Sequence, residues 1–471
     1  MKNLVRRFFS VRSMLGKREC FGEIPSTKVI YTNLIRLAWP SVLEMVLMSL
    51  VGSVDTIMVG VLGPAALAAV GLTTQPRMLM LTFFFALNVG VTAVVSRRKG
   101  EDRRDEANHT LRNALILMTA LSVVIMIVAF SFSRPLMEFA GAKADTIVDA
   151  EAYFRIMMLG IPINAITMCI NAAQRGIGNS RITLVVNLSS NVVNIVLDFL
   201  LVTGRFGFPR LEVRGDAISS VVGFVVGFIF CLISVTSRRS ARNFLHLSLR
   251  DNWRLKKEII KPVLTVGSSA MIEQIGMRIG FFAYAIIVAS LGTESFAAHQ
   301  IAMQFTSISF TFGDGVGVAG TSLVGQMLGK KRPDLSFLYG KASQRVAFGV
   351  SCCLFFVILS LRYKMVGLFT SDADVINIAA NVMIVVALFQ PFQMSAVVMS
   401  GCLRGAGDTR YVAMVMLLCV CFLRPVLSLL AIHVFHLGLV GAWSSSLTDM
   451  IIRMTAVYLR FSSNKWATIK V

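Results

Sequence analysis

The 471 residues are 55% hydrophobic and 15% charged, with a mean hydropathy of +0.72. This composition excludes an ordinary soluble globular protein and is typical of an integral membrane protein. A formal net charge of +21 would suit a nucleic-acid-binding protein, but the basic residues lie in short runs between apolar stretches. That pattern is typical of cytoplasmic loops between membrane spans, so we expect a lipid bilayer and no nucleic acid as partner.

The first 33 residues form a basic segment that contains Lys2, Arg6, Arg7, Arg12, Lys17, Arg18 and Lys28. It has no apolar core long enough for a secretory signal peptide, so we expect a cytoplasmic N-terminal tail at residues 1–33. The alternative is an arginine-rich organelle-targeting peptide, in which case residues 1–30 would not be retained.

From Leu34 onward, about twelve segments are long and apolar enough to cross the hydrocarbon core of a bilayer. They are residues 34–61, 65–96, 111–132, 150–173, 182–203, 215–237, 260–290, 295–328, 344–370, 377–401, 411–433 and 438–460. We therefore predict an all-α integral membrane protein with about twelve transmembrane helices in two pseudo-symmetric six-helix lobes. The predicted divisions are an N-lobe at 34–237, a basic cytoplasmic linker at 238–259, a C-lobe at 260–460 and a cytoplasmic tail at 461–471.

The loops alternate in charge. Clusters of Lys and Arg near residues 97–104, 175–181, 238–261, 330–332 and 404–410 fall on the same side as both termini. The loops on the other side, at 62–64, 291–294 and 434–437, contain no Lys or Arg, although Arg205, Arg210 and Arg214 between the fifth and sixth spans break the trend. The positive-inside rule then predicts cytoplasmic termini and a multi-pass protein of the plasma, or bacterial inner, membrane.

The two halves of the chain repeat each other. Glu273 lies 229 residues after Glu44, and the same shift relates RGIGNSR at 175–181 to RGAGDTR at 404–410. Because each half has an even number of spans, the two copies enter the membrane from the same side and are related by an axis along its normal. Parallel repeats of this kind enclose a site between the halves, which indicates a transporter.

The fifth span carries a polar stripe of Asn187, Asn191, Asn194 and Asp198, at helical spacings of four, three and four. Such a stripe must face protein or a watery cavity, because lipid offers no hydrogen-bond partners. One interpretation is a helix-packing stripe of amides. The other is functional, since an acid at membrane depth is costly and therefore marks a functional-site hypothesis.

Asp55, in the first span, is the natural partner of Asp198, with Asn194 between them as a neutral donor. Two carboxylates in a poorly solvated pocket disfavour double ionisation, so one of them could bind and release a proton as the cavity changes sides. Alternatively, both ionise and hold a sodium ion between their oxygen atoms. The residue types permit either coupling ion, H⁺ or Na⁺.

A second set of polar residues predicts a substrate cavity. The eighth span has a stripe that ends at Asp314, and Tyr284 occupies the position that matches Asp55 in the first half. The candidate cavity residues are Glu44, Asn191, Glu273, Tyr284, Gln304, Asp314 and Gln390. For Glu44 and Glu273 the alternative is a structural role with local donors, and Arg424 is a candidate partner for one of these two acids.

We find no sequence signature of an enzyme: no Walker-type phosphate loop, GxSxG, HExxH or paired Cys–His set. We therefore expect no catalytic residues, no cofactor and no metal beyond the possible sodium ion, with energy supplied by an ion gradient or a separate partner. The eight cysteines lack disulfide or metal spacing and are expected to be buried thiols.

Several motifs, in the right order and in duplicate, resemble one family. VDTIMVGVLGPAALAAVGL, its copy ending in ASLGTESFAAHQIA, the twin RGxG loops and NIVLDFLLVTG are similar to the multidrug and toxic compound extrusion (MATE) family over residues 34–460. The resemblance implies a twelve-helix antiporter that expels small organic, often cationic, compounds in exchange for protons or sodium, and that functions as a monomer. It also implies that Asp55, Asn194 and Asp198 belong to the coupling site, with Ser220 in place of a threonine common in the sixth helix.

Two departures from the family pattern favour coupling in the first lobe. The tenth span offers only amides where some members have an acid, and Asp216 stands where a small apolar residue is usual. The alternative function is a lipid-linked precursor flippase of a related superfamily, which should have a strongly cationic cavity. Arg278 and Arg424 alone are too few for that.

Overall fold

In the computed structural model, described for residues 7–16, 18–237, 244–248, 250–370 and 372–469, every regular element is a helix. Parts of the predicted tails and linker, at residues 1–6, 17, 238–243, 249 and 470–471, lie outside the described residues. The chain forms two compact units: unit 1 comprises residues 1–42 and 268–471, and unit 2 comprises residues 43–267. The boundaries fall within helices α3 (Thr27–Gly60) and α10 (Lys257–Ala289).

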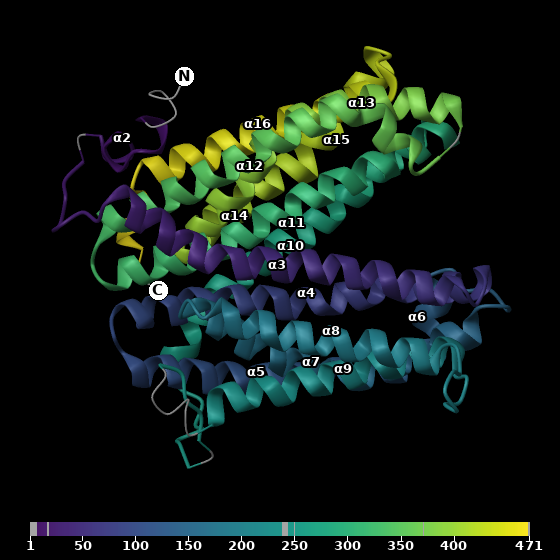
Figure 1. Cartoon of the computed structure of the whole chain (residues 1–471), viewed down its shortest axis with the longest axis horizontal. Helices are drawn as coiled ribbons and strands as arrows, with labels where there is room; N and C mark the ends of the chain where they lie inside the picture. The colour runs from purple at the N-terminus through teal and green to yellow at the C-terminus, as the bar shows by residue number, and fades with distance from the viewer. Residues whose placement is uncertain (1–6, 17, 238–243, 249, 371, 470–471) are drawn as a thin grey trace. The chain divides into compact units, whose positions relative to one another are not determined.

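Unit 2 is a bundle of long helices joined by short loops. After the second part of α3 come α4 (Pro64–Gly100), α5 (Arg104–Ser131), α6 (Ser133–Phe139), α7 (Ile147–Gly176), α8 (Ser180–Leu201) and α9 (Glu212–Thr236). Figure 1 shows α5, α7 and α9 running side by side, and α7 packs against both of the others. The α4–α5 connection is short because Asp102 turns the chain in the left-handed conformation, with φ of 57°.

Unit 1 repeats this plan with the helices α11 (Thr293–Gly329), α12 (Pro333–Gly367), α13 (Ala373–Gly405), a composite span at 409–434 and α16 (Gly438–Ser462). The short helix α2 (Val11–Leu15) packs against α12, and η4 (Lys465–Thr468) follows α16. Helix α13 is central, since it packs against α11, α12 and α16.

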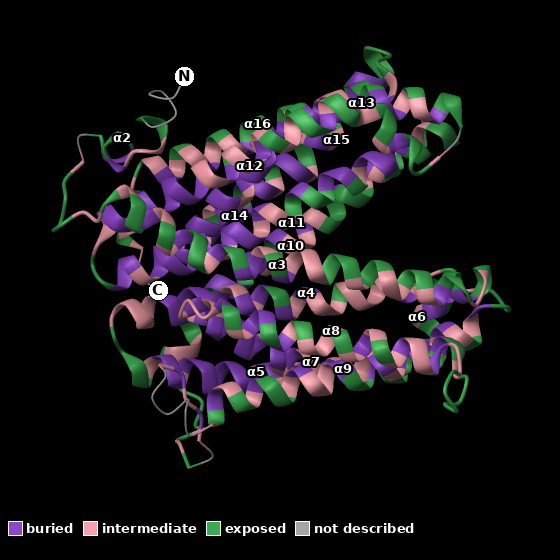
Figure 2. Cartoon of the chain, in the orientation of Figure 1, coloured by how far each residue is buried: buried purple, intermediate pink, exposed green. Residues whose placement is uncertain are grey.

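Ten helical spans of the described chain are long and apolar enough to cross a membrane. The long helices α11 and α16, packed among them in unit 1, complete a set of about twelve. Large apolar side chains such as Phe282, Phe356 and Phe422 are exposed, as expected where a helix faces lipid rather than water. Figure 2 shows such exposed positions along the helices of each unit. The predicted all-α membrane architecture is confirmed.

The internal repeat is visible in side-chain contacts. Thr92 Oγ1 donates to the carbonyl oxygen of Ala172 at 3.1 Å, and Thr321 Oγ1 donates to that of Gly401 at 2.7 Å. Both residues of the second pair lie 229 positions after those of the first. The repeat therefore preserves the hydrogen bond that joins its second helix to its fourth.

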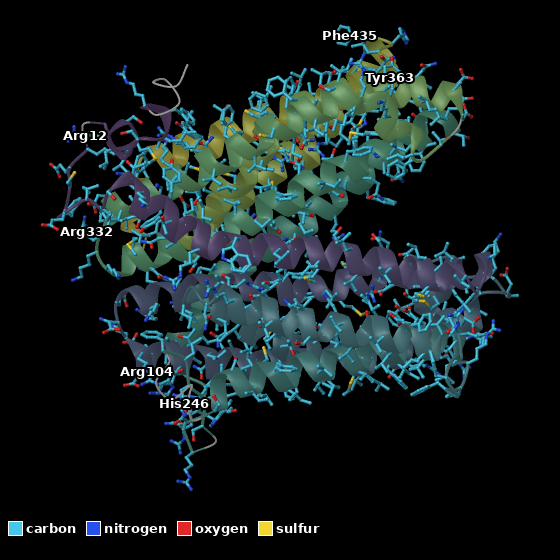
Figure 3. All side chains as sticks on the ribbon, in the orientation of Figure 1. Arg12, Arg104, His246, Arg332, Tyr363 and Phe435 are labelled. Atoms are coloured by element: carbon cyan, nitrogen blue, oxygen red, sulfur yellow. The ribbon has the colours of Figure 1, made fainter. Side chains whose placement is uncertain are left out.

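The described part of the N-terminal segment packs on unit 1. The Arg18 guanidinium donates to the Ser462 carbonyl oxygen, and the Phe21 N–H donates to Asp334 Oδ2 at 3.2 Å. Arg18 in the N-terminal segment therefore lies beside the end of α16. Figure 3 shows Arg12 at the same end of unit 1 as Arg332, while Tyr363 and Phe435 mark the other end.

The eleventh predicted span differs from a regular α-helix. It consists of α14 (Thr409–Met416), the π-helical segment η2 (Leu417–Leu423), α15 (Arg424–Leu429) and a second π-helical segment, η3 (Leu430–Val434). Pro425 lacks an N–H and cannot continue the α-helical hydrogen bonding, which accounts for the wider turns that precede it. The sequence predicted a membrane span at residues 411–433 but not its π-helical turns.

The cysteines are less uniformly buried than predicted. Cys231 and Cys419 are buried, but Cys353 is exposed on an outward face of α12. An apolar face in contact with lipid accepts a thiol as readily as a protein core does.

Candidate functional site

The first candidate site lies in unit 2 and depends on the close approach of α8 and α9. A Cβ at Gly223 would lie 2.9 Å from the Ser190 carbonyl oxygen, so only glycine allows this spacing. Gly227, four residues on, also faces Ser190. Small residues four apart are a common means of bringing membrane helices together. The contact places the polar stripe of α8 against the first two thirds of α9.

Three aspartates gather at this contact. Asp198 and Asp216 are buried, with 0% and 2% of their surface exposed, and Asp55 is half-buried. Asp198 is within hydrogen-bonding reach of both Asp55 and Asp216. One oxygen of each carboxylate is buried without a hydrogen-bond partner: Asp55 Oδ1, Asp198 Oδ2 and Asp216 Oδ1. Adjacent carboxylates with unpaired buried oxygens require a proton or a cation between them.

The structure therefore brings Asp55 and Asp198 together, as the sequence predicted. The other two predicted members lie next to them but contact each other: Asn194 Nδ2 donates to Ser220 Oγ at 3.3 Å. The serine that donates to Asp198 Oδ1 is Ser219, one residue earlier than the predicted Ser220.

Three neighbours of this cluster were not predicted as site residues. Asp216 was noted only as a departure from the family pattern. The Tyr153 hydroxyl lies close to Asp216, and the Arg77 guanidinium attracts both Asp55 and Asp216. Arg77 and Asp216 each have a signal in the sequence, because a charged residue within an apolar span needs a partner. We call Asp55, Asp198 and Asp216, with Tyr153 and Arg77, the acid cluster.

Glu44 is buried elsewhere in unit 2 and is well supplied with donors. Arg175 Nη1 lies 3.3 Å from Oε1, Asn187 Nδ2 donates to Oε1 at 2.6 Å, and Thr183 Oγ1 donates to Oε2 at 2.8 Å. These contacts favour the structural interpretation of Glu44. Asn191, on the same stripe as Asn187, is half-buried in unit 2.

Glu273 has the equivalent arrangement in unit 1. Its Oε1 lies 2.6 Å from Arg404 Nη2, and its side chain is 1% exposed. Arg175 and Arg404 are the first residues of the twin RGxG loops, 229 positions apart. The repeat thus assigns these loops a role that the motif alone did not show: each supplies the arginine that neutralises the buried glutamate of its own unit.

Arg424 pairs with neither glutamate, so the expected pairing is wrong. Its Nη2 lies 2.6 Å from Asp449 Oδ2, and Arg453 Nη2 lies 3.5 Å from the same oxygen. Asp449 and Arg453 are four residues apart on α16, a spacing that favours ion pairs on one helix face. Asp449 is fully buried, so it needs a cation and α15 provides it.

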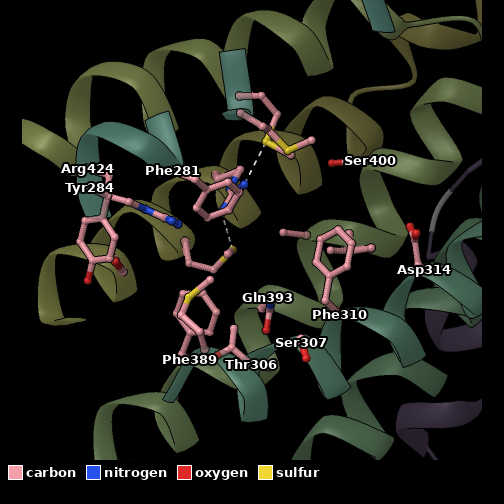
Figure 4. Close-up of a pocket in the computed structure, with 18 of the residues that line it drawn as sticks. Phe281, Tyr284, Thr306, Ser307, Phe310, Asp314, Phe389, Gln393, Ser400 and Arg424 are labelled. Carbon is pink, nitrogen blue, oxygen red and sulfur yellow. Dashed lines mark hydrogen bonds between the residues drawn. The ribbon is translucent and has the colours of Figure 1, made fainter. Parts of the chain in front are cut away.

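A second candidate site is a cavity of about 430 Å³ within unit 1. Tyr284 and Asp314 line it, whereas Glu273, Gln304 and Gln390 of the predicted cavity set do not. Gln390 is buried, with Nε2 donating to the Val386 carbonyl oxygen at 3.0 Å, and Gln304 is exposed. Figure 4 shows Arg424 and Asp314 on different sides of the cavity, with Phe281, Phe310 and Phe389 around it. The predicted cavity between the two halves stays a prediction.

Within the residues that the structure describes, no group of three or more His, Cys, Asp or Glu side chains has the geometry to hold a metal ion. Asp55 and Asp198 of the acid cluster, with the neighbouring Ser219, nevertheless offer oxygen atoms. Oxygen ligands of this kind suit a proton or a hard monovalent cation rather than a transition metal.

Fold and sites define an all-α membrane protein built from two repeated helical units, with a cluster of aspartates in one unit and an arginine-lined cavity in the other. The MatE family model matches residues 40–200 and 269–430, one match in each repeat. The chain belongs to the MatE family, which confirms the resemblance to MATE transporters.

Named relatives are similar to this chain over most of its length. The chain is 28% identical over 446 residues to the probable multidrug resistance protein NorM of Thermotoga maritima, covering 94% of each sequence. It is 28% identical over 390 residues to the multidrug resistance protein PmpM of Pseudomonas aeruginosa, covering 82% of this chain and 80% of that one. A solved outward-facing multidrug resistance MATE transporter of the MOP superfamily superimposes with a TM-score of 0.85 at 23% identity, covering 93% of this chain and 97% of that one.

Proposed function

We propose that this protein is a secondary-active exporter of small organic compounds in which the acid cluster couples transport to an ion gradient. The observation that carries the proposal is the contact between Asp55 and Asp198, which lie on two different helices and each have an unpaired buried oxygen. A contact of this kind is stable when one carboxyl group donates to the other and unstable when both are ionised.

Loss of the shared proton would therefore push α3 and α8 apart, and its return would close them again. Asp216 and Tyr153 lie beside the pair, and Arg77 limits how much negative charge the cluster accumulates. The carboxyl-to-carboxyl contact favours protons over sodium as the coupling ion, since a sodium site needs both carboxylates ionised. We place this activity in the plasma or inner membrane, with both termini cytoplasmic and the monomer as the functional unit.

The test is efflux of ethidium, a cationic dye, from proteoliposomes under an imposed pH gradient and, separately, under a sodium gradient. We expect the pH gradient to drive efflux by the wild type and Asp55→Asn to abolish it. Asp374→Asn, at an exposed acid near the start of α13, is the matched control and should transport normally. Normal efflux by Asp55→Asn would contradict the proposal, and efflux driven by sodium alone would replace the proton with sodium.

The flippase alternative gains one observation from the structure. Arg404 and Arg453 join Arg278 and Arg424 around the unit 1 cavity, so the number of arginines is twice that expected from the sequence. A cavity of this charge could accept the diphosphate of a lipid-linked precursor. The ligand that this cavity selects is therefore the next question.

A further inference from the structure

The unit 1 cavity has an excess of positive charge at its wall. Four guanidinium groups line it, from Arg278, Arg404, Arg424 and Arg453, with Asp314 as the lining carboxylate. Two further carboxylates lie behind the wall: Glu273 pairs with Arg404, and Asp449 pairs with Arg424 and Arg453. Asp314 also attracts Arg404. Four cations thus outnumber three anions.

Arg278 accounts for the excess. It is exposed toward the cavity, and no carboxylate lies within ion-pair distance of it in the described chain. Arg453 is almost fully buried, and its Nε has no hydrogen-bond partner, while its two terminal nitrogens contact the sulfur atoms of Met416 and Met450. A guanidinium group that has only weak sulfur acceptors and a shared carboxylate retains unused donors. The cavity therefore offers strong hydrogen-bond donors to an incoming anion.

Much of the rest of the wall is apolar and aromatic, with uncharged polar side chains such as Ser307 and Gln393 between these residues. Phe281, Phe310, Phe389 and Trp443 line the cavity, and Arg424 Cζ lies 5.3 Å from the centre of the Phe281 ring. Its volume falls within the roughly 300–1,000 Å³ range of small-molecule sites. Such a site fits a ligand with an anionic head and an apolar body.

We propose that the unit 1 cavity binds an amphipathic organic anion, with Arg278 as the main contact for its head group. This adds an anionic ligand class, bound in unit 1, to the cationic dye by which export is tested, so it rests on the proposed function for its physiological meaning. The anion has two possible sources, a free organic acid or the head group of a lipid diphosphate, and both present the same chemistry to the arginines.

The test compares two probes with one aromatic body and opposite charge, naphthalene sulfonate and naphthyl methylammonium, by calorimetric titration of the purified full-length protein in detergent. We expect the sulfonate to bind at least about tenfold more tightly than the ammonium. Tighter or equal binding of the ammonium overturns the proposal, as does absence of binding by both the sulfonate and farnesyl diphosphate.

Variants locate the site. Arg278→Gln should weaken sulfonate binding about tenfold, because it removes one charge-assisted contact without leaving a buried acid unpaired. Arg278→Lys keeps the charge and should bind within about threefold of the wild type. Arg410→Gln, at an exposed arginine of unit 1 outside the cavity wall, is the matched control and should bind as the wild type does. Unchanged sulfonate binding by Arg278→Gln would overturn the assignment.

Farnesyl diphosphate is the third probe and separates the two sources. Tighter binding of this lipid than of the sulfonate, with the same loss in Arg278→Gln, supports the anion site and assigns it to lipid diphosphates. These titrations need no ion gradient, so they are independent of the coupling mechanism. If the protein binds the sulfonate but exports nothing under any gradient, the anion site stands and the proposed export function is refuted. If the protein exports under a gradient but binds no anion, the export function stands and the anion site is refuted.

Discussion

The buried ion pair between Glu273 and Arg404 gives a sharp prediction about stability. Glu273→Gln keeps the shape of the side chain but leaves the Arg404 guanidinium without its carboxylate. Loss of one partner of a buried ion pair costs about 3–5 kcal/mol. Because the Arg404 side chain is 20% exposed and Asp314 still attracts it, we expect the lower limit of that range.

A loss of about 3 kcal/mol in the free energy of unfolding lowers the midpoint by about 6–12 °C for a unit of this size. The assay is thermal unfolding of the detergent-solubilised protein, followed by the fraction that remains monodisperse after heating. Glu294→Gln, at an exposed acid in the first turn of α11, is the matched control and should unfold within about 1 °C of the wild type.

The double variant Glu273→Met with Arg404→Met tests the cause. It removes both charges and should recover most of the loss, since no buried charge remains uncompensated. An unchanged midpoint in Glu273→Gln would refute the reasoning, as would a double variant that is less stable than Glu273→Gln.

Two further predictions concern packing and topology. A Cβ at Gly280 of α10 would lie 2.5 Å from the Val420 carbonyl oxygen in η2, so Gly280→Ala should lower the free energy of unfolding by about 1–3 kcal/mol in the same assay. Gly367 has open space around it, so Gly367→Ala is the control and should cost little. Equal unfolding midpoints for the two variants would contradict the close approach of α10 and η2. Cys20 is exposed beside Arg18 in the N-terminal segment, which we expect to be cytoplasmic. A membrane-impermeant maleimide should therefore label Cys20 in inside-out vesicles but not in intact cells, with Cys20→Ser as the control. Labelling of Cys20 in intact cells would contradict cytoplasmic termini.

Periodicity and repetition were enough to predict the spans. A long apolar segment in a bilayer satisfies its backbone hydrogen-bonding groups by forming a helix, so the number and approximate limits of the spans follow from hydropathy. The largest error in a boundary was at α12, predicted from residue 344 but beginning at Pro333. Its first turns mix charged residues such as Asp334 and Lys341 with apolar ones that pack against the N-terminal segment. Hydropathy detects the lipid-facing part of a helix rather than its full length.

The acid pair was predictable and its surroundings were not. The spacing of Asn194 and Asp198 and the isolated Asp55 indicated one site because charges in apolar spans need partners. Tyr153 and Arg77 lie on other helices, with no shared period to connect them to that site. Their proximity depends on how α7 and α4 pack, which sequence spacing alone does not determine.

The arginines of unit 1 show the same limit. The sequence marks Arg424 as an unusual cation and offers the repeated glutamates as its candidate partners. The actual partner, Asp449, has no counterpart in the repeat that would have drawn attention to it, although its spacing of four from Arg453 was available. Arg404 was read as part of a loop motif. The cationic character of the cavity became visible only when four helices were assembled around it.

The measurement that tests the central claim most directly is proton movement driven by substrate. Proteoliposomes that enclose a pH-sensitive dye are given an ethidium gradient with no imposed pH difference. We predict that ethidium flux through the wild type drives protons in the opposite direction, and that Asp198→Asn and Asp55→Asn each abolish this proton flux while the protein remains folded. Ethidium flux without proton movement in the wild type, or undiminished proton flux in both variants, would contradict coupling through the acid cluster.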